Sequence, residues 1–232
     1  MNKTLARIRD FKIGTTLLLI LLVGIWSIPT IGLLITAFRD RTAADTSGWW
    51  EAIASPMTQD WTLAAFEKVL SVDDMFGSFI NTIVVTVPAT VLPLLIASMA
   101  AYAFTFLEFK GREIYFATIV ALMVIPLQAA LVPVVRGLRF IKETTGLSLM
   151  GNFAGAWLVH SAFALPLAIY ILRNYMMTLP VALIEAARID GASWWQIFWR
   201  LVMPMSVPAV ASFAIFQFLW VWNDYLIAFV FI

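Results

Sequence analysis

The polar residues best suited to contact a small molecule lie inside apolar stretches of the sequence. Asn223 and Asp224 interrupt the last apolar run, and Trp220, Trp222 and Tyr225 flank them. A carboxylate at membrane depth costs about 2.5–3.5 kcal/mol on insertion scales, so it usually faces a cavity or a partner. Aromatic rings beside hydrogen-bonding groups suit a sugar, whose apolar faces stack on rings. Two interpretations stay open: residues that face a pathway, or interfacial residues that pair with a neighbouring helix.

Gln128 and Asn81 are weaker candidates for the same pathway, because a lone amide in an apolar run is more often a packing residue. The single histidine, His160, has no second histidine and no cysteine as a co-ligand, so we expect no metal site and interpret it as a packing or hydrogen-bonding residue. The sequence has no G-x-x-x-x-G-K-S/T phosphate loop, no G-x-G-x-x-G fingerprint and no local catalytic triad motif. We therefore expect neither enzyme activity nor a bound cofactor.

The most compact polar segment between apolar runs is residues 185–192, with the sequence EAARIDGA. Pro180 suits the first position of a helix, and Thr178 is placed to cap it. Residues 181–190 are mostly good helix formers, and Gly191 suits the left-handed position that ends a helix. This segment predicts a short helix and a tight turn outside the lipid.

A second short helix is predicted directly after this turn. Ser193 and Gln196 have the spacing of a capping box, and Pro204 is expected to close the helix. Large aromatic residues of this helix are expected to hold it against the membrane bundle: Trp194, Trp195, Phe198 and Trp199.

The composition indicates a membrane protein. Of the 232 residues, 62% are hydrophobic and only 12% charged, and the mean hydropathy is +0.91. Soluble domains are about 45–50% apolar and about 25% charged, so the chain has too little polar surface for a water-soluble body. A net charge of +1 gives no indication of a nucleic-acid partner, and the absence of cysteine excludes disulfides and thiolate chemistry.

Five apolar segments are long enough to cross a bilayer, so we expect an all-α polytopic membrane protein with five visible spans. The expected divisions are a basic arm, a first transmembrane helix, an external loop with a helix near residues 63–70, and a core: 1–12, 13–38, 39–76 and 77–232. The spans of the core are expected at 79–106, 114–135, 153–172 and 206–232, with a short external loop at 137–152 and an internal polar loop at 173–205. Because the chain stops inside apolar sequence, we expect a sixth span to be missing.

The distribution of charge orients these spans. Nine of the fifteen lysines and arginines fall on the side of the N-terminus, which is therefore placed in the cytoplasm. The loop at 39–76 has a net charge of −4 and is placed outside. Paired prolines interrupt two spans, Pro88 with Pro93 and Pro126 with Pro133, and predict kinks. Kinked helices around a pathway and bent packing without one stay open as explanations.

The segment at 185–192 resembles the conserved cytoplasmic loop of binding-protein-dependent ABC importer permeases. That pattern is E-A-A, three residues, G, nine residues, I-x-L-P, and here Glu185-Ala186-Ala187 and Gly191 precede Leu201-Val202-Met203-Pro204. Leu201 and Met203 depart from it by conservative apolar swaps. The fuller E-A-A-x-x-D-G-A is similar to the carbohydrate-uptake, maltose/maltodextrin-type branch. Supporting similarities are the segment of residues 61–81 and the sequence WNDY at residues 222–225.

The resemblance implies the type I ABC importer permease fold and a sugar-permease subunit in the bacterial inner membrane. It implies a second permease as heterodimer partner, two ATP-binding cassette subunits that bind ATP and magnesium, and an external sugar-binding protein. The residues implied in coupling to an ATPase subunit are Glu185, Ala186, Ala187, Asp190, Gly191 and Ala192. Glucose or an α-glucoside is the substrate suggested by the branch.

Other functions remain as alternatives. A self-sufficient secondary transporter predicts internal repeats and several intramembrane ionisable groups, of which only Asp224 is clear. A membrane-embedded enzyme needs a cluster of polar catalytic groups, which the isolated His160 does not supply. A plain interfacial connector would explain the aromatic residues after Gly191, but it does not explain the E-A-A-x-x-D-G-A pattern.

Overall fold

The structure is a computed structural model that describes residues 2–71 and 75–232, with side chains from residue 13 onward. Asp73, Asp74 and the side chains of the basic arm lie outside the described part. The chain forms two compact units, Met1–Ser78 and Phe79–Ile232. Regular structure in the described residues is helical, apart from one isolated bridge between Arg39 and Trp61.

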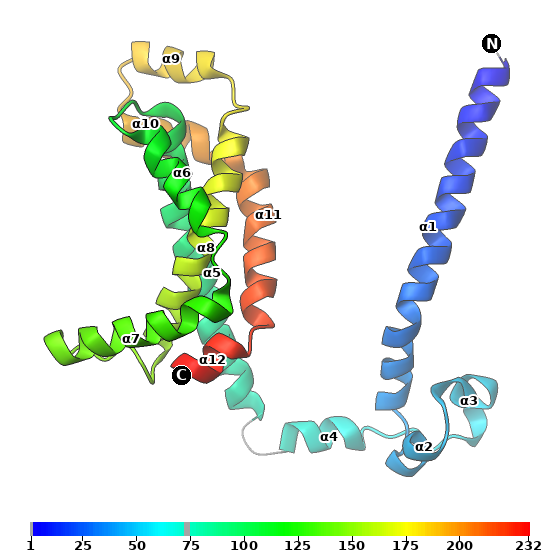
Figure 1. The fold of residues 1–232 in the computed structure, drawn as a ribbon. Coiled ribbons are helices and arrows are strands. Elements are labelled where there is room, and N and C mark those ends of the chain that lie inside the picture. The colour runs from blue at the N-terminus through cyan, green and yellow to red at the C-terminus, as the bar shows by residue number, and fades with distance from the viewer. Residues whose placement is uncertain (1, 72–74) are drawn as a thin grey trace. The chain divides into compact units, whose positions relative to one another are not determined.

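The first unit consists of one long helix followed by short helices (Figure 1). The most apolar 18-residue window within Ile13–Ala37 has a mean hydropathy of 2.5, and only 6% of its residues are buried, as suits a helix whose side chains face lipid. The helix expected near residues 63–70 is confirmed as α4. The elements are α1 (Asn2–Ala37), α2 (Arg41–Thr46), α3 (Trp49–Ala54), η1 (Pro56–Thr58) and α4 (Ala64–Ser71).

Arg39 holds the short helices of this unit together. Its side chain is 3% exposed. It donates hydrogen bonds to Gln59 Oε1 and to the carbonyl oxygens of Ala43 and Ser47. A buried guanidinium is stable only when its donors are paired, so this residue organises a loop that has little core of its own.

The second unit is a helical bundle built on α5, α8 and α11 (Figure 1). Alanines 97, 101 and 168 are fully buried between its helices. Such small side chains let helix backbones approach closely without a hydrophobic driving force in lipid. The elements are α5 (Met75–Phe106), α6 (Arg112–Leu122), α7 (Leu127–Thr145), α8 (Phe153–Met176), α9 (Val181–Ile189), α10 (Trp194–Ile197), the π-helical turn η2 (Phe198–Val202), α11 (Met203–Trp222) and α12 (Leu226–Phe231).

Four helices in the described residues are long and apolar enough to cross a membrane, and the bent pair α6–α7 adds a fifth if its two helices together form one span. An all-helical membrane protein is therefore confirmed, with four or five candidate spans where five were predicted.

The bounds predicted for the third span, 114–135, are wrong, but its interruption lies at Pro126, where a kink was predicted. Helix α6 ends at Leu122, and α7 starts at Leu127 in a direction 106° away. Pro126 precedes the first residue of α7; a proline there restricts the preceding residue to extended conformations and separates the two helices. Helix α7 then continues to Thr145, so the loop expected at 137–152 is mostly helical.

The prediction of an unbroken fifth span to residue 232 is also wrong. Helix α11 ends at Trp222, and the short helix α12 follows after a break at residues 223–225. Asn223 Nδ2 donates to the carbonyl of Leu219, and Asp224 Oδ2 accepts from the backbone N–H of Ile227. Asn and Asp side chains compete in this way with helical hydrogen bonding, so the two polar residues end one helix and start the next.

Candidate functional site

The loop that carries EAARIDGA folds as a helix and a turn. The predicted helix is confirmed as α9 (Val181–Ile189), with Asp190 as its C-cap. Gly191 has a φ of +82°, the left-handed conformation expected from its position. The predicted cap by Thr178 is wrong: its hydroxyl donates to the carbonyl of Tyr175, and Pro180 occupies the N-cap position without a side-chain hydrogen bond.

The capping box after the turn is confirmed, but the helix it starts does not end at Pro204. Ser193 and Gln196 make both reciprocal hydrogen bonds of the box. From Trp194 the chain stays helical through α10, η2 and α11 to Trp222. Pro204 lies near the start of α11 and is accommodated because the π-helical turn before it already interrupts the regular hydrogen bonding. The loop is therefore rigidly continuous with the last long helix.

The residues of α9 divide into a buried side and an exposed side. Ile184 is buried, whereas Glu185, Ala186, Asp190 and Gly191 are exposed. Half-buried positions of the same motif are Ala187 and Ala192. Ile189 is 87% exposed, so the free side of α9 combines a carboxylate with apolar surface. An open depression of about 370 Å³ beside it includes Asp190, Gly191 and Arg200.

Tyr102 of α5 fastens this loop to the bundle, a contact that the sequence did not reveal. Its hydroxyl donates to the carbonyl oxygen of Trp194 over 3.0 Å, and its ring lies 5.2 Å from that of Phe198. The guanidinium of Arg188 lies 4.3 Å from the centre of the Trp194 ring, within the range of a cation–π interaction. Of the aromatic residues expected to hold α10, only Phe198 is fully buried; Trp194, Trp195 and Trp199 are 37–61% exposed.

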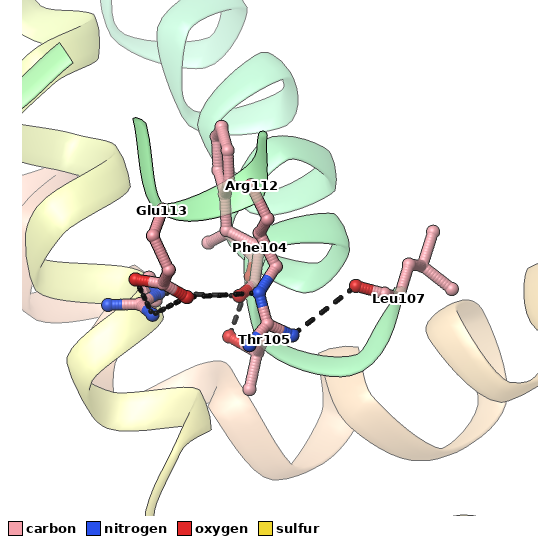
Figure 2. Close-up of polar contacts among 7 residues, drawn as sticks. Phe104, Thr105, Leu107, Arg112 and Glu113 are labelled. Atoms are coloured by element: carbon pink, nitrogen blue, oxygen red, sulfur yellow. Dashed lines mark hydrogen bonds and ion pairs between the residues drawn. The ribbon is translucent and has the colours of Figure 1, made fainter. Parts of the chain in front are cut away.

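A second fastening lies where α5, α6 and α8 meet. Arg173 of α8 donates to the carbonyl of Phe104, lies 3.4 Å from both carboxylate oxygens of Glu113, and covers the ring of Phe116 at 4.0 Å. Figure 2 shows the Glu113 carboxylate also paired with Arg112, at 3.0 Å. These contacts tie the α5–α6 turn to the helix that leads into α9.

At the far end of the bundle the two helix breaks form a groove of about 810 Å³. Gln128 from the start of α7 and Asp224 from the α11–α12 break both line it, together with Trp220. The structure thus brings together two of the polar candidates that are distant in sequence. The remaining lining is mainly apolar, from α6, α7, α8 and α12, and the volume lies within the range of about 300–1,000 Å³ common for ligand sites.

The other sequence candidates do not line this groove. Asn223 is exposed and bonded to its own helix, and Tyr225 is 74% exposed and stacked on Phe229. Trp222 is half-buried, with its ring against Phe79 and Phe218. Asn81 is exposed on α5.

Asp224 has a neighbour that sequence reasoning did not connect with it. His160 Nε2 of α8 lies 3.7 Å from Asp224 Oδ2, and the His160 side chain is 2% exposed. Within the described part of the chain, Nε2 makes no hydrogen bond. Each residue alone was a lone polar group in an apolar run, and only the packing of α8 against the α11–α12 break places them together.

Comparison with known proteins identifies the family. Residues 63–232 match the family described as "Binding-protein-dependent transport system inner membrane component". The chain belongs to this family. The osmoprotective compounds uptake permease protein GgtD of Synechocystis sp. is 44% identical to this permease over 222 residues, which cover 95% of the chain and 72% of GgtD. The alpha-glucoside transport system permease protein AglG of Rhizobium meliloti is 34% identical, over 92% of the chain and 80% of AglG.

The fold of the permease agrees with this assignment. A bacterial ABC transporter involved in the import of the acidic polysaccharide alginate contains a chain that superposes with a TM-score of 0.77 at 25% identity, over 97% of this permease and 75% of that chain. The resemblance inferred from the EAARIDGA segment is therefore confirmed at the level of the family. The protein is a multi-pass inner membrane component of an ABC importer, and such components have no ATPase activity and no cofactor of their own.

Proposed function

We propose that this permease forms half of the translocation path of an ATP-driven sugar importer and receives mechanical work through residues 180–204. The observation that carries the proposal is the exposed α9, held over the bundle by Tyr102, Trp194 and Arg188. The contact set is Glu185, Ala186, Ala187, Asp190, Gly191 and Ala192. Small alanines let a partner surface come close, and Glu185 offers a carboxylate to a basic group.

The continuity of the helices supports a route for the movement. Helix α8 leads into α9, and the uninterrupted helix from Trp194 to Trp222 leads away from it. Tyr175 of α8 also donates a hydrogen bond to the carbonyl of Met205 over 3.2 Å. A displacement of α9 by an ATPase subunit is therefore passed to α8 and α11 together, and these helices reach the groove at the far end.

Membership of the family supports the proposed partners and substrate class. The full importer in this proposal has a second permease subunit, two ATPase subunits that bind ATP and magnesium, and an external binding protein that delivers the solute. The α9 end and the N-terminus lie on the cytoplasmic side. Relatives are named for the uptake of an α-glucoside, diacetylchitobiose and osmoprotective compounds, which favours a sugar or a sugar-like osmolyte. Asp224, Gln128 and Trp220 are the groove residues proposed to meet it.

The test reverses one exposed charge on α9. Glu185→Lys should leave the permease inserted in the membrane, because the side chain is exposed, but remove the ATPase subunits on purification and lower ATP-dependent uptake at least about 10-fold. Gly191→Pro should act in the same direction, because proline is fixed near φ −65° and cannot adopt +82°.

The matched control is Glu143→Lys, which reverses an exposed charge at the end of α7. If both α9 variants retain their ATPase subunits and normal uptake, the coupling assignment is wrong. Uptake by the chain alone in proteoliposomes, driven by an ion gradient and indifferent to ATP, would instead establish the secondary transporter.

A further inference from the structure

The carboxylate of Asp224 is held in a defined position. Its Oδ2 accepts from the backbone N–H of Ile227 over 2.8 Å and lies 3.7 Å from His160 Nε2. Both contacts use the same oxygen, so Oδ1 is the atom that remains for a ligand. The side chain is 16% exposed and lines the groove of about 810 Å³.

The buried His160 opens onto a second, smaller space. A chamber of about 70 Å³ between α8 and α11 is lined by His160, Gln217 and aromatic side chains. Trp220 belongs to the walls of both the chamber and the groove. One water needs roughly 10–15 Å³ measured in this way, so the chamber has room for several waters or for a hydroxymethyl group. A buried ring nitrogen without a hydrogen bond is costly, and a ligand hydroxyl in this chamber would satisfy it.

The groups around these two spaces match the surface of a sugar. Trp220 is 52% exposed and presents an aromatic ring, on which the C–H face of a pyranose stacks. Asp224 Oδ1 accepts hydroxyl hydrogens, His160 Nε2 makes one hydrogen bond, and the exposed amide of Gln128 can both donate and accept. The rest of the groove is apolar, as is common where a few polar groups fix a ligand's orientation.

We propose that His160, Asp224 and Trp220 form a hydroxyl-binding subsite for a neutral polyhydroxylated solute at the α11–α12 break, in which one solute hydroxyl bridges His160 Nε2 and the Asp224 carboxylate. This inference rests on the proposed transport function and assigns the solute class to one place on the path. A cationic solute is less well matched, because a group that bridges His160 and Asp224 has to accept one hydrogen and donate another, which a hydroxyl can do and an ammonium group cannot.

The experiment measures selectivity rather than rate. The assembled importer is reconstituted with its binding protein, and uptake of radiolabelled maltose, trehalose and sucrose is measured. For each transported sugar, half-saturating concentrations are then compared with those of its mono-deoxy analogues. In the wild type, loss of the hydroxyl that meets Asp224 should weaken transport about 10- to 100-fold, as expected for a hydrogen bond to a charged group.

Substitutions then test whether the preference for that hydroxyl arises at the subsite. For Asp224→Asn, the ratio of half-saturating concentrations between one analogue and its parent sugar should move toward 1. Helix α12 stays capped, because asparagine also caps helices. His160→Phe keeps a ring of similar size without Nε2 and should shift the same ratio, and His160→Gln should restore part of it. Discrimination by the binding protein is common to all variants and cancels from the comparison.

Glu143→Gln, which removes a charge outside the groove, is the matched control and should leave every ratio unchanged. If His160 and Asp224 have only a structural role, their substitutions lower uptake of all analogues equally and keep the wild-type ratios. That result, with the ATPase subunits still bound and active, would overturn the proposal. If the wild type transports a cationic solute and none of the three sugars, both the subsite and the proposed sugar function are wrong.

Discussion

The two ends of the Phe79–Ile232 unit differ in how they are filled. At the α9 end, side chains contact one another directly: Tyr102 bonds to Trp194, Arg188 covers the same indole, and Arg173 joins three neighbours. At the α7–α12 end, where the two helix breaks lie (Figure 1), Gln128 and Asp224 line an open groove. His160 Nε2, next to Asp224, makes no hydrogen bond within the described residues. A tightly packed end can transmit a displacement, whereas an end with space and available polar groups can bind a ligand.

The comparison also explains why the helix breaks occur where they do. A break in a transmembrane helix exposes backbone polar groups, which is tolerated only where protein or a water-filled cavity satisfies them. The α6–α7 and α11–α12 breaks meet at the same groove. By contrast, the helix that follows the α9 loop accommodates Pro204 without a break. The irregular backbone is therefore concentrated at the end proposed for solute binding.

Among substitutions at the two ends, Asp224→Ala is expected to have the largest effect on transport. Alanine removes the cap of α12, worth about 0.5–2 kcal/mol, and also the partner of His160 and the carboxylate of the groove. Uptake should fall more than about 10-fold and selectivity among sugars should change, measured as initial rates with three α-glucosides. Unchanged kinetics and selectivity would remove Asp224 from the path and leave the groove without its main polar group.

A smaller effect is expected from Tyr102→Phe at the packed end. The phenylalanine keeps the ring contacts and removes only the hydrogen bond to the Trp194 carbonyl, which still accepts from the backbone N–H of Phe198. A loss of about 1 kcal/mol is typical for such a bond. The ATP hydrolysed per sugar imported should rise about two- to fivefold, with the half-saturating sugar concentration unchanged.

Tyr170→Phe is the control for this variant, because the Tyr170 hydroxyl makes no hydrogen bond within the described residues and its ring stacks on Phe116. Equal effects of the two substitutions would mean that the Tyr102–Trp194 bond does not transmit movement. A change in the half-saturating sugar concentration for Tyr102→Phe would mean that the packed end also affects solute binding, so the two ends would not have separate roles.

The local fold of the α9 loop, though not the Tyr102 contact that holds it, was predictable from the sequence because its signals are local. Pro180, Gly191 and the Ser193–Gln196 box act within a few residues and require no knowledge of the fold. Hydropathy likewise predicts the number of spans, since lipid imposes the same requirement on each of them.

The groove at the α7–α12 end was not predictable, because its features depend on tertiary packing. Prolines 88, 93 and 133 stay inside helices, whereas Pro126 adjoins a 106° turn, and no local rule distinguishes them. The His160–Asp224 pair joins α8 to the α11–α12 break, and each residue alone had a reasonable interpretation as a packing group. Sequence patterns thus identified the candidate Asp224 and Gln128 but not the groove that unites them.

The smallest effect is expected from Glu113→Gln, which removes the carboxylate shown in Figure 2. The Glu113 side chain is 64% exposed and lies 3.4 Å from Arg173, and exposed ion pairs typically contribute about 0–1 kcal/mol. Arg173 keeps its contacts with the Phe104 carbonyl and the Phe116 ring. The thermal unfolding temperature of the purified importer should therefore change by no more than about 2 °C, whereas Arg173→Leu, which removes all three contacts, should lower it further. If Glu113→Gln destabilises the importer as much as Arg173→Leu does, the ion pair itself is the fastening, and the packed end depends on exposed charge more than on buried contacts.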